Sequence, residues 1–205
     1  MTGYINFIKD FPNRCRDILH IAREPALLCG REVTLAIMVA SAGFVVPYER
    51  LKFKPDHPSG DSRTFSDAAE KLKSLLDKPF TSSVLFNKMG SPWYDGRVVC
   101  VNGRPESWGG LRKREPFSKD KTVKTTINVI RNGLAHGNIF TFDNPIHEIA
   151  FVEKKNFNGV GVVSHYSFVS VGPEEFLQFL HNWFDFLNDF DIPQEVTFEV
   201  LKYAA

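Results

Sequence analysis

The apolar segment Phe176–Phe190 constrains the fold more than any other part of the chain. Its large apolar side chains cover most of the circumference of a helix instead of forming one stripe. They are Phe176, Leu177, Phe179, Leu180, Trp183, Phe184, Phe186, Leu187 and Phe190. Gly172-Pro173 is suited to begin this helix, and Glu174 and Glu175 suit the positive end of its dipole. We therefore predict a long helix that is buried on two sides or that faces a partner chain.

The first fifty residues also have helical patterns. Apolar residues over 4–22 recur with the spacing of one helix face. Pro12 is expected to break or kink a continuous helix there, so that two shorter helices are one outcome. Pro25 is suited to begin the next helix. That helix is predicted to run to about Phe44, because Pro47 disfavours a helical conformation at the residue before it.

Two further helices are predicted in the middle of the chain. One spans about residues 67–77 and is stopped by Pro79. The other spans about residues 120–136 and carries a single apolar stripe, which consists of Val123, Ile127, Ile130 and Leu134. Gly137 is a natural residue just past its end.

Residues 146–171 have the pattern of a β-hairpin. Segments 146–153 and 160–171 are rich in β-branched and aromatic residues, and Asn158-Gly159 lies between them. Residues 90–116 are predicted to be an irregular insertion loop with a short strand at about 97–101. With 43% hydrophobic residues and a net charge of +1, the chain is not expected to be disordered. The prediction is one domain over 1–205: mainly α, a helical bundle with a β-hairpin insertion before the last long helix.

The segment Ile130–Gly137 reads Ile-Arg-Asn-Gly-Leu-Ala-His-Gly. Its Arg, Asn and His follow an RxxxxH pattern with Asn directly after Arg, and the sequence resembles the HEPN superfamily of small helical bundles. In one group of HEPN proteins an early helix runs into a VxPxERL-like turn, which residues 45–51 match, and the motif reads much like RNALAHGNI, which residues 131–139 match. The resemblance is strongest over 125–140, extends over 25–51 and 146–190, and is absent from 90–116.

This resemblance implies a metal-independent endoribonuclease, acting in prokaryotic defence or as a toxin. The residues suit that chemistry. His136 can take or deliver a proton near neutral pH. Arg131 can stabilise charge on a phosphate, and Asn132 can orient His136 or a phosphate by hydrogen bonds. Attack by the ribose 2′-OH on the adjacent phosphate would leave a 2′,3′-cyclic phosphate and a 5′-OH.

The spacing of the motif limits how one chain can use it. Arg131 and His136 lie about 140° apart around an ideal helix, so one straight helix does not place both on one face. Either Gly133 or Gly137 lets the helix end bend, or two subunits combine their motifs. HEPN ribonucleases are known to combine motifs, so the resemblance favours a homodimer with a composite active site.

Other interpretations of the motif stay open. Arg131 can be a surface residue and His136 a C-terminal cap that complements the helix dipole. The chain can also be a catalytically silent HEPN module that binds RNA or a protein partner, or a helical adaptor whose aromatic last helix docks a partner. An antitoxin or regulatory protein is a possible partner. Some HEPN toxins carry a tyrosine after the histidine that a partner enzyme modifies, but Gly137-Asn138-Ile139 stands here.

Positive charge gathers between residues 97 and 124, where eight basic residues stand against three acidic ones, with Trp108 among them. Basic side chains bind phosphates without sequence preference, and aromatic rings stack on unpaired bases. The predicted RNA-contacting residues are Arg112, Lys113, Arg114, Lys121 and Lys124. The alternative is a solvated loop without a ligand.

No cofactor or metal is expected, since the histidines and cysteines show no metal-ligand spacing. The three cysteines are far apart, which fits a reducing cytoplasm. The best candidate for a membrane span, 26–46, is interrupted by Arg31 and Glu32, and its clean apolar part is shorter than the roughly 20 residues of a span. A buried core helix and a cytoplasmic protein are therefore predicted, with no membrane partner.

Overall fold

A computed structural model of the chain describes residues 7–52, 66–88, 90, 92–101, 107–108, 114–156 and 163–190. The helices are α1 (Phe7–Leu28), α2 (Glu32–Gly43), α3 (Val45–Leu51), α5 (Ser66–Leu76), the 3-10 turn η1 (Phe80–Ser82), α6 (Val123–His136) and α7 (Pro173–Asn188). The strands are β1 (Tyr94–Val98), β2 (Glu115–Pro116), β3 (Ile139–Phe142), β4 (Glu148–Asn156) and β5 (Val163–Val171). They form one antiparallel sheet in the order β2-β1-β5-β4-β3.

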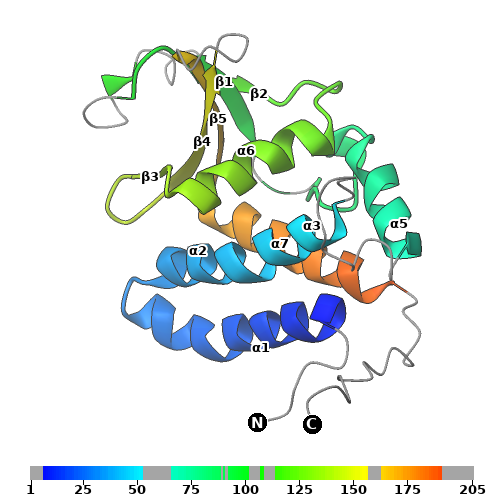
Figure 1. Cartoon of the computed structure of the whole chain (residues 1–205). Coiled ribbons are helices and arrows are strands. Elements are labelled where there is room, and N and C mark those ends of the chain that lie inside the picture. Colours follow the sequence, from blue (N-terminus) through cyan, green and yellow to red (C-terminus); the bar gives the residue numbers. More distant parts are fainter. Residues whose placement is uncertain are drawn as a thin grey trace, which may run out of the picture.

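Helix α7 is the centre of the packing, as its apolar circumference predicts. On one side the Trp183 indole lies 5.1 Å from the Phe44 ring, and its Nε1 donates to the carbonyl of Gly43 at 3.2 Å. On the other side the Phe176 ring lies 4.9 Å from that of Phe151 on β4. Figure 1 shows α6 between the sheet and the helices α2 and α3, with α1 and α2 side by side at the end away from the sheet. The prediction of burial on two sides is confirmed.

The N-terminal helices differ from the prediction in where they break. Helix α1 continues through both Pro12 and Pro25, so Pro12 does not divide it and Pro25 does not begin a new helix. The chain instead breaks at Gly30, whose φ is +62°. There the amide of Arg31 donates to the carbonyl of Ala26 at 2.7 Å, which closes the Schellman type of helix end. A glycine in the left-handed region thus ends the helix that proline was expected to interrupt.

The middle helices agree with the sequence pattern. Helix α5 matches the predicted 67–77 within one residue at each end, and α6 ends at His136 as predicted. The Thr122 hydroxyl caps the start of α6 by accepting from the Thr125 amide at 3.3 Å. At the other end Gly137 has a φ of +68°, the left-handed conformation that glycine accommodates.

The sheet is larger than the predicted hairpin. Strands β4 and β5 form that hairpin, but they are the middle of a five-stranded sheet and not an insertion, so the fold is mixed α and β rather than mainly α. Strand β3 was missed because it has only four residues and begins three residues after the end of the motif helix. The predicted loop 90–116 supplies β1, which lies at Tyr94–Val98 rather than at 97–101, and also β2.

The described part of 90–116 is not irregular throughout. Trp93 joins the main core beside Phe80, with ring centroids 5.0 Å apart. Trp108 packs on the opposite face of the sheet, where its ring lies 4.6 Å from that of Phe140. Burial of two tryptophans explains why this segment is held against the sheet.

The segment Glu32–Leu51, which comprises α2 and α3, is long and apolar enough to cross a membrane by length and composition alone. It lies near the N-terminus, and 44% of its apolar window is buried inside the fold.

Candidate active site

The motif helix α6 lies very close to strand β4. A Cβ atom added at Gly133 would stand 3.0 Å from the Cβ of Phe151 and 3.2 Å from the carbonyl oxygen of Asn138. The backbone joins the two elements further, since the amide of Asn138 donates to Gly133 at 2.9 Å and that of Val152 to Asn138 at 3.0 Å. The lack of a side chain at Gly133 therefore sets how closely the motif approaches the sheet.

Arg131 is half-buried and held on two sides. Its Nε lies 2.9 Å from Oε1 of Glu49 on α3, an ion pair whose N–H is not aligned for a hydrogen bond. Its Nη1 donates to Oδ1 of Asn132 at 2.5 Å. Of the five N–H donors of the guanidinium, one is hydrogen-bonded to Asn132, and the Nε–H faces Glu49 without a hydrogen bond. The remaining donors can contact a phosphate while the group keeps its orientation.

Asn132 connects the motif with strand β4. Its Nδ2 donates to Oε1 of Glu153 at 2.7 Å, and the other oxygen of Glu153 forms an ion pair with Nζ of Lys155 at 2.6 Å. The Glu153 side chain is only 13% exposed. A polar chain therefore runs from Glu49 through Arg131 and Asn132 to Glu153, and it joins α3, α6 and β4.

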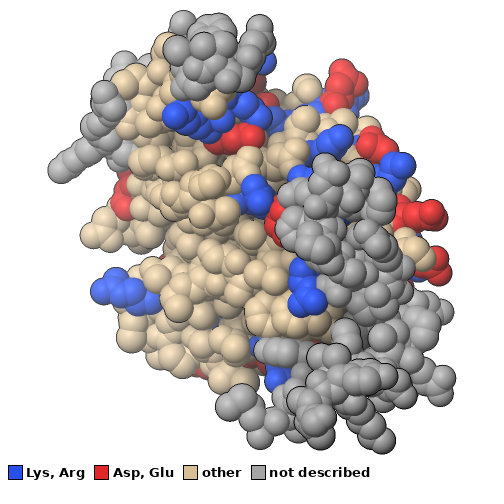
Figure 2. Space-filling view, in the orientation of Figure 1, with Lys and Arg blue, Asp and Glu red and all other residues tan. Residues whose placement is uncertain are grey.

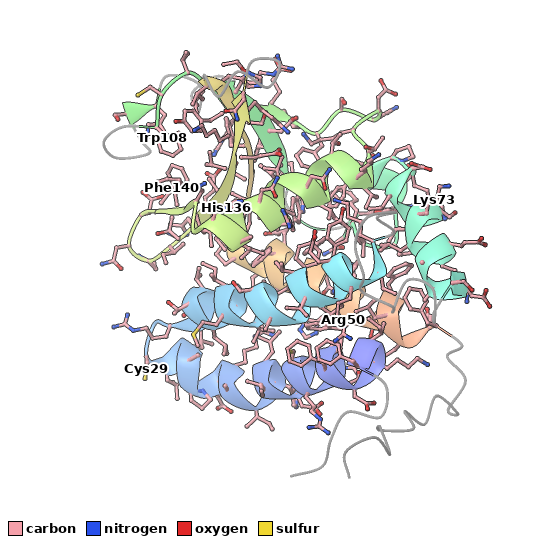
Figure 3. All side chains as sticks on the ribbon, viewed as in Figure 1. Cys29, Arg50, Lys73, Trp108, His136 and Phe140 are labelled. Carbon is pink, nitrogen blue, oxygen red and sulfur yellow. The ribbon has the colours of Figure 1, made fainter. Side chains whose placement is uncertain are left out.

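His136 is exposed at the end of α6 that meets the sheet (Figure 3). It lines a pocket of about 380 Å³, formed by Asn132, His136, Asn138, Val152, Glu153 and Lys154. Arg131 does not line this pocket. The expectation that one helix does not turn Arg131 and His136 to the same face agrees with this arrangement, and Asn132 is the motif residue that touches Arg131 and also lines the pocket of His136.

A second interaction between α3 and α6 lies beside this network. The Tyr48 hydroxyl donates to Oδ1 of Asn128 at 3.1 Å. Burial, with a smaller effect of the nearby Glu49 carboxylate, raises the pKa of Tyr48 to about 12, against the opposing effect of Arg131. Tyr48 therefore stays a neutral hydrogen-bond donor at physiological pH.

Two acidic residues of the site were not named as site residues from the sequence. Glu49 stands in the 45–51 segment that matches the HEPN turn, but its pairing with Arg131 is 82 positions away in sequence and follows no local spacing. Glu153 follows Ile149 and Phe151 on the same face of β4. A carboxylate that continues a buried apolar row is a usable signal of a partnered side chain.

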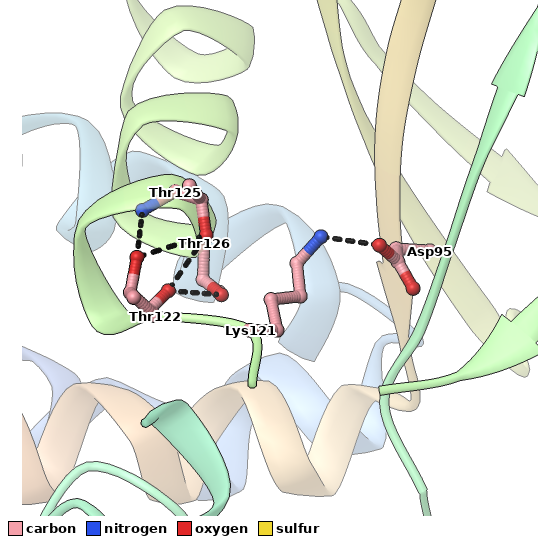
Figure 4. A network of polar contacts seen from close by, with 5 residues as sticks. All are labelled: Asp95, Lys121, Thr122, Thr125 and Thr126. Atoms are coloured by element: carbon pink, nitrogen blue, oxygen red, sulfur yellow. Dashed lines mark hydrogen bonds and ion pairs between the residues drawn. The ribbon is translucent and has the colours of Figure 1, made fainter. Parts of the chain in front are cut away.

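The predicted RNA-contacting residues differ in their surroundings. Lys121 forms an ion pair with Asp95 of β1, beside the capped start of α6 (Figure 4). Arg114 pairs with Glu148 and lies 4.5 Å over the ring of Tyr94. Lys124 is exposed, and Arg112 and Lys113 lie outside the described residues. Figure 2 shows acidic side chains interspersed with the basic ones on this face, so the visible charge is mixed.

Among the residues that the structure describes, no group of three or more His, Cys, Asp or Glu side chains could hold a metal ion. Cys15 is buried, which raises the pKa of its thiol, whereas Cys29 and Cys100 are exposed. None of the three cysteines is in a disulfide.

The family model described as HEPN pEK499 p136 matches residues 1–194. The chain belongs to this HEPN family. The match spans the early helices, the motif helix α6, the sheet and α7. The likeness noted over 25–51 and 125–140 is therefore part of a relationship that extends over nearly the whole chain. Curated proteins and solved structures show no significant match.

For this HEPN chain the family suggests a nuclease or RNA-related function at the level of the superfamily.

Proposed function

We propose that this HEPN protein is a metal-independent endoribonuclease. The observation that carries the proposal is the polar network of Glu49, Arg131, Asn132 and Glu153, which holds two motif side chains in fixed orientations next to the exposed His136. If Arg131 were purely structural, its ion pair with Glu49 would be sufficient. The additional hydrogen bond to Asn132, which lines the pocket of His136, connects Arg131 with that pocket.

In the proposed reaction the 2′-oxygen of a ribose attacks the adjacent phosphorus atom. The bond between phosphorus and the 5′-oxygen breaks, and the products are a 2′,3′-cyclic phosphate and a 5′-hydroxyl. His136 takes the proton from the 2′-hydroxyl, and its imidazolium then delivers a proton to the leaving 5′-oxygen. Arg131 stabilises the negative charge that builds on the phosphate oxygens. Asn132 positions Arg131, because its Oδ1 accepts from the guanidinium while its Nδ2 is held by Glu153.

A homodimer is part of this proposal. Arg131 faces α3 while His136 lines the pocket on the sheet side. A phosphate that needs both groups is served best when two copies bring their motifs together, so that one copy supplies the arginine and the other the histidine. The proposed setting is the cytoplasm, in a toxin or defence role, with an antitoxin or regulatory protein as a further partner.

The test of the chemistry uses a short RNA and its matched analogue with one 2′-deoxyribose at the cut. Cleavage of the RNA in excess EDTA is expected to continue, to yield a cyclic phosphate, and to stop with the deoxy analogue. Cleavage of the deoxy analogue, or silencing by EDTA, would show that the mechanism is wrong even though the family is right.

The second candidate is a silent HEPN module that binds RNA or a protein without cleaving it. The pairing of Arg131 with Glu49 favours this alternative, because an acid next to the arginine lowers its attraction for phosphate. RNA binding without any cleavage, in the same preparation that elutes as a dimer, would support it over the nuclease.

A further inference from the structure

A second polar pocket, of about 300 Å³, lies between α6 and the sheet. It is within the size range of small-ligand sites. Glu153 lines both this pocket and the pocket of His136. The two cavities are therefore neighbours on either side of the carboxylate that holds Asn132.

The sheet extends a row of polar residues from the motif into this pocket. Glu153 on β4 stands opposite Ser167 on β5, which in turn stands opposite Arg97 on β1. Neighbouring strands lie about 4.8 Å apart, so the backbone at Arg97 is about 10 Å from that at Glu153. All three residues line the pocket. A ligand strand that leaves the motif along this row would thus reach Arg97.

The charges of the pocket favour an anionic ligand. Three cations and two carboxylates line it. Each carboxylate forms an ion pair with a lysine, Asp95 with Lys121 and Glu153 with Lys155, so the third cation, Arg97, is not neutralised by either of them. The side chain of Arg97 is exposed and forms no ion pair or hydrogen bond within the described part of the chain. Its planar fork of donors matches the oxygens of a phosphate.

The neutral groups of the pocket include an oriented donor. Because the oxygen of Asn128 accepts from Tyr48, its Nδ2 is the atom left for a ligand, and within the described residues it makes no hydrogen bond. Ser167 supplies a half-buried hydroxyl that also lacks a partner there. Such groups suit the acceptor atoms of a sugar or a base edge.

We propose that this pocket is a substrate subsite that binds the nucleotide next to the scissile bond, with Arg97 as the contact to its flanking phosphate. This subsite rests on the proposed ribonuclease function. Arg97 is here a positioning residue, because the phosphate it holds is not the one that reacts.

The test compares two substrates that differ by one phosphate. A dinucleoside monophosphate contains only the scissile phosphate, whereas a three-nucleotide RNA adds a flanking one. Arg97→Gln is expected to lower kcat/KM about tenfold on the longer RNA, as for loss of a charged hydrogen bond, and to leave the dinucleoside unchanged. The matched control is Arg31→Gln, an exposed arginine on the α1–α2 connection, which should change neither. Equal losses on both substrates, or no loss on either, would overturn the subsite.

A binding measurement separates this proposal from the nuclease itself. The affinity of His136→Ala protein for a labelled single-stranded RNA is measured against salt concentration, with and without Arg97→Gln. Loss of one phosphate contact should reduce the slope of log affinity against log salt by about one. A reduced slope supports the subsite even if the wild-type protein cuts no RNA, in which case the proposed function alone fails. An unchanged slope, or no RNA binding at all, refutes the subsite.

Discussion

The ion pair between Arg131 and Glu49 gives the sharpest test of the proposed site, because it separates stability from catalysis. The side chains are 27% and 24% exposed. Exposed ion pairs contribute roughly 0.2–1 kcal/mol, whereas removing one partner of a fully buried pair costs roughly 3–5 kcal/mol. A pair at this depth lies between these limits, so Arg131→Gln is expected to lower the free energy of unfolding by about 2 kcal/mol. For a chain of this size that loss lowers Tm by roughly 4–8 °C.

A double-mutant cycle with Glu49→Gln isolates the pair. Two facing amides can still hydrogen-bond. The loss of unfolding free energy in the double variant is therefore expected to be smaller than the sum of the two single losses, by about 1–2 kcal/mol. Cleavage should respond differently. Arg131→Gln should abolish it, Glu49→Gln should lower it about tenfold because Arg131 loses its orientation, and the double variant should stay inactive.

The assays are thermal unfolding by circular dichroism and cleavage of a short RNA by the same preparations. The control cycle uses Arg16 and Asp185, whose side chains are 36% and 69% exposed and 3.1 Å apart. Its coupling should be below about 0.5 kcal/mol, with full cleavage. Additive losses for Arg131 and Glu49, or wild-type cleavage by Arg131→Gln, would refute the reasoning.

Three other predictions concern the same region. His136→Ala should abolish cleavage while Tm changes by no more than a few degrees, because the side chain is exposed at a helix end; cleavage at the wild-type rate would remove His136 from the mechanism. Light scattering at micromolar concentration should give twice the 23.3 kDa mass, and a monomer alone would contradict the composite site. Tyr48→Phe should cost about 1 kcal/mol at neutral pH. The pKa of Tyr48 in the folded protein is raised from its usual 10 to about 12, so the stability that Tyr48 contributes is complete below pH 10 and declines as the pH rises toward 12. Urea unfolding should therefore show a smaller loss of stability between pH 10 and 12 for Tyr48→Phe than for the wild-type protein.

Most of the helical core and the hairpin of β4 and β5 were predictable from the sequence, whereas β2 and β3 were missed and β1 was predicted three residues too late. The circumference of α7 and the stripe of α6 are local patterns, so they predict both elements with their ends close to the observed ones. Strands β1 and β3 are five and four residues long, which is too short for a clear alternating pattern. They are strands because they pair with β5 and β4, and that pairing is not visible in the local sequence. The break at Gly30 was missed because two prolines nearby gave a stronger but misleading signal.

The site shows the same division. Arg131, Asn132 and His136 could be predicted as site residues because they lie within one helix and match a family pattern, and their roles stay a prediction. Glu49 and Glu153 were not found as site residues, since each comes to the motif from another element. A pattern of residue types along the chain carries no information on which acid will face Arg131 once α3 has packed on α6. That choice depends on the packing around Tyr48, which is buried between them.

The close approach of α6 to β4 at Gly133 has a consequence for mutational surveys of this protein. Alanine at this position would gain about 1 kcal/mol of helix propensity, but its methyl group would meet the backbone of β4, which cannot rotate aside as a side chain can. The helix and the strand would have to separate by a few tenths of an ångström, and the distance from Asn132 to Glu153 would grow with that shift. In a library selected for loss of RNA cleavage, codon 133 should therefore be hit as often as the codons for Arg131 and His136, although glycine offers the reaction no chemical group.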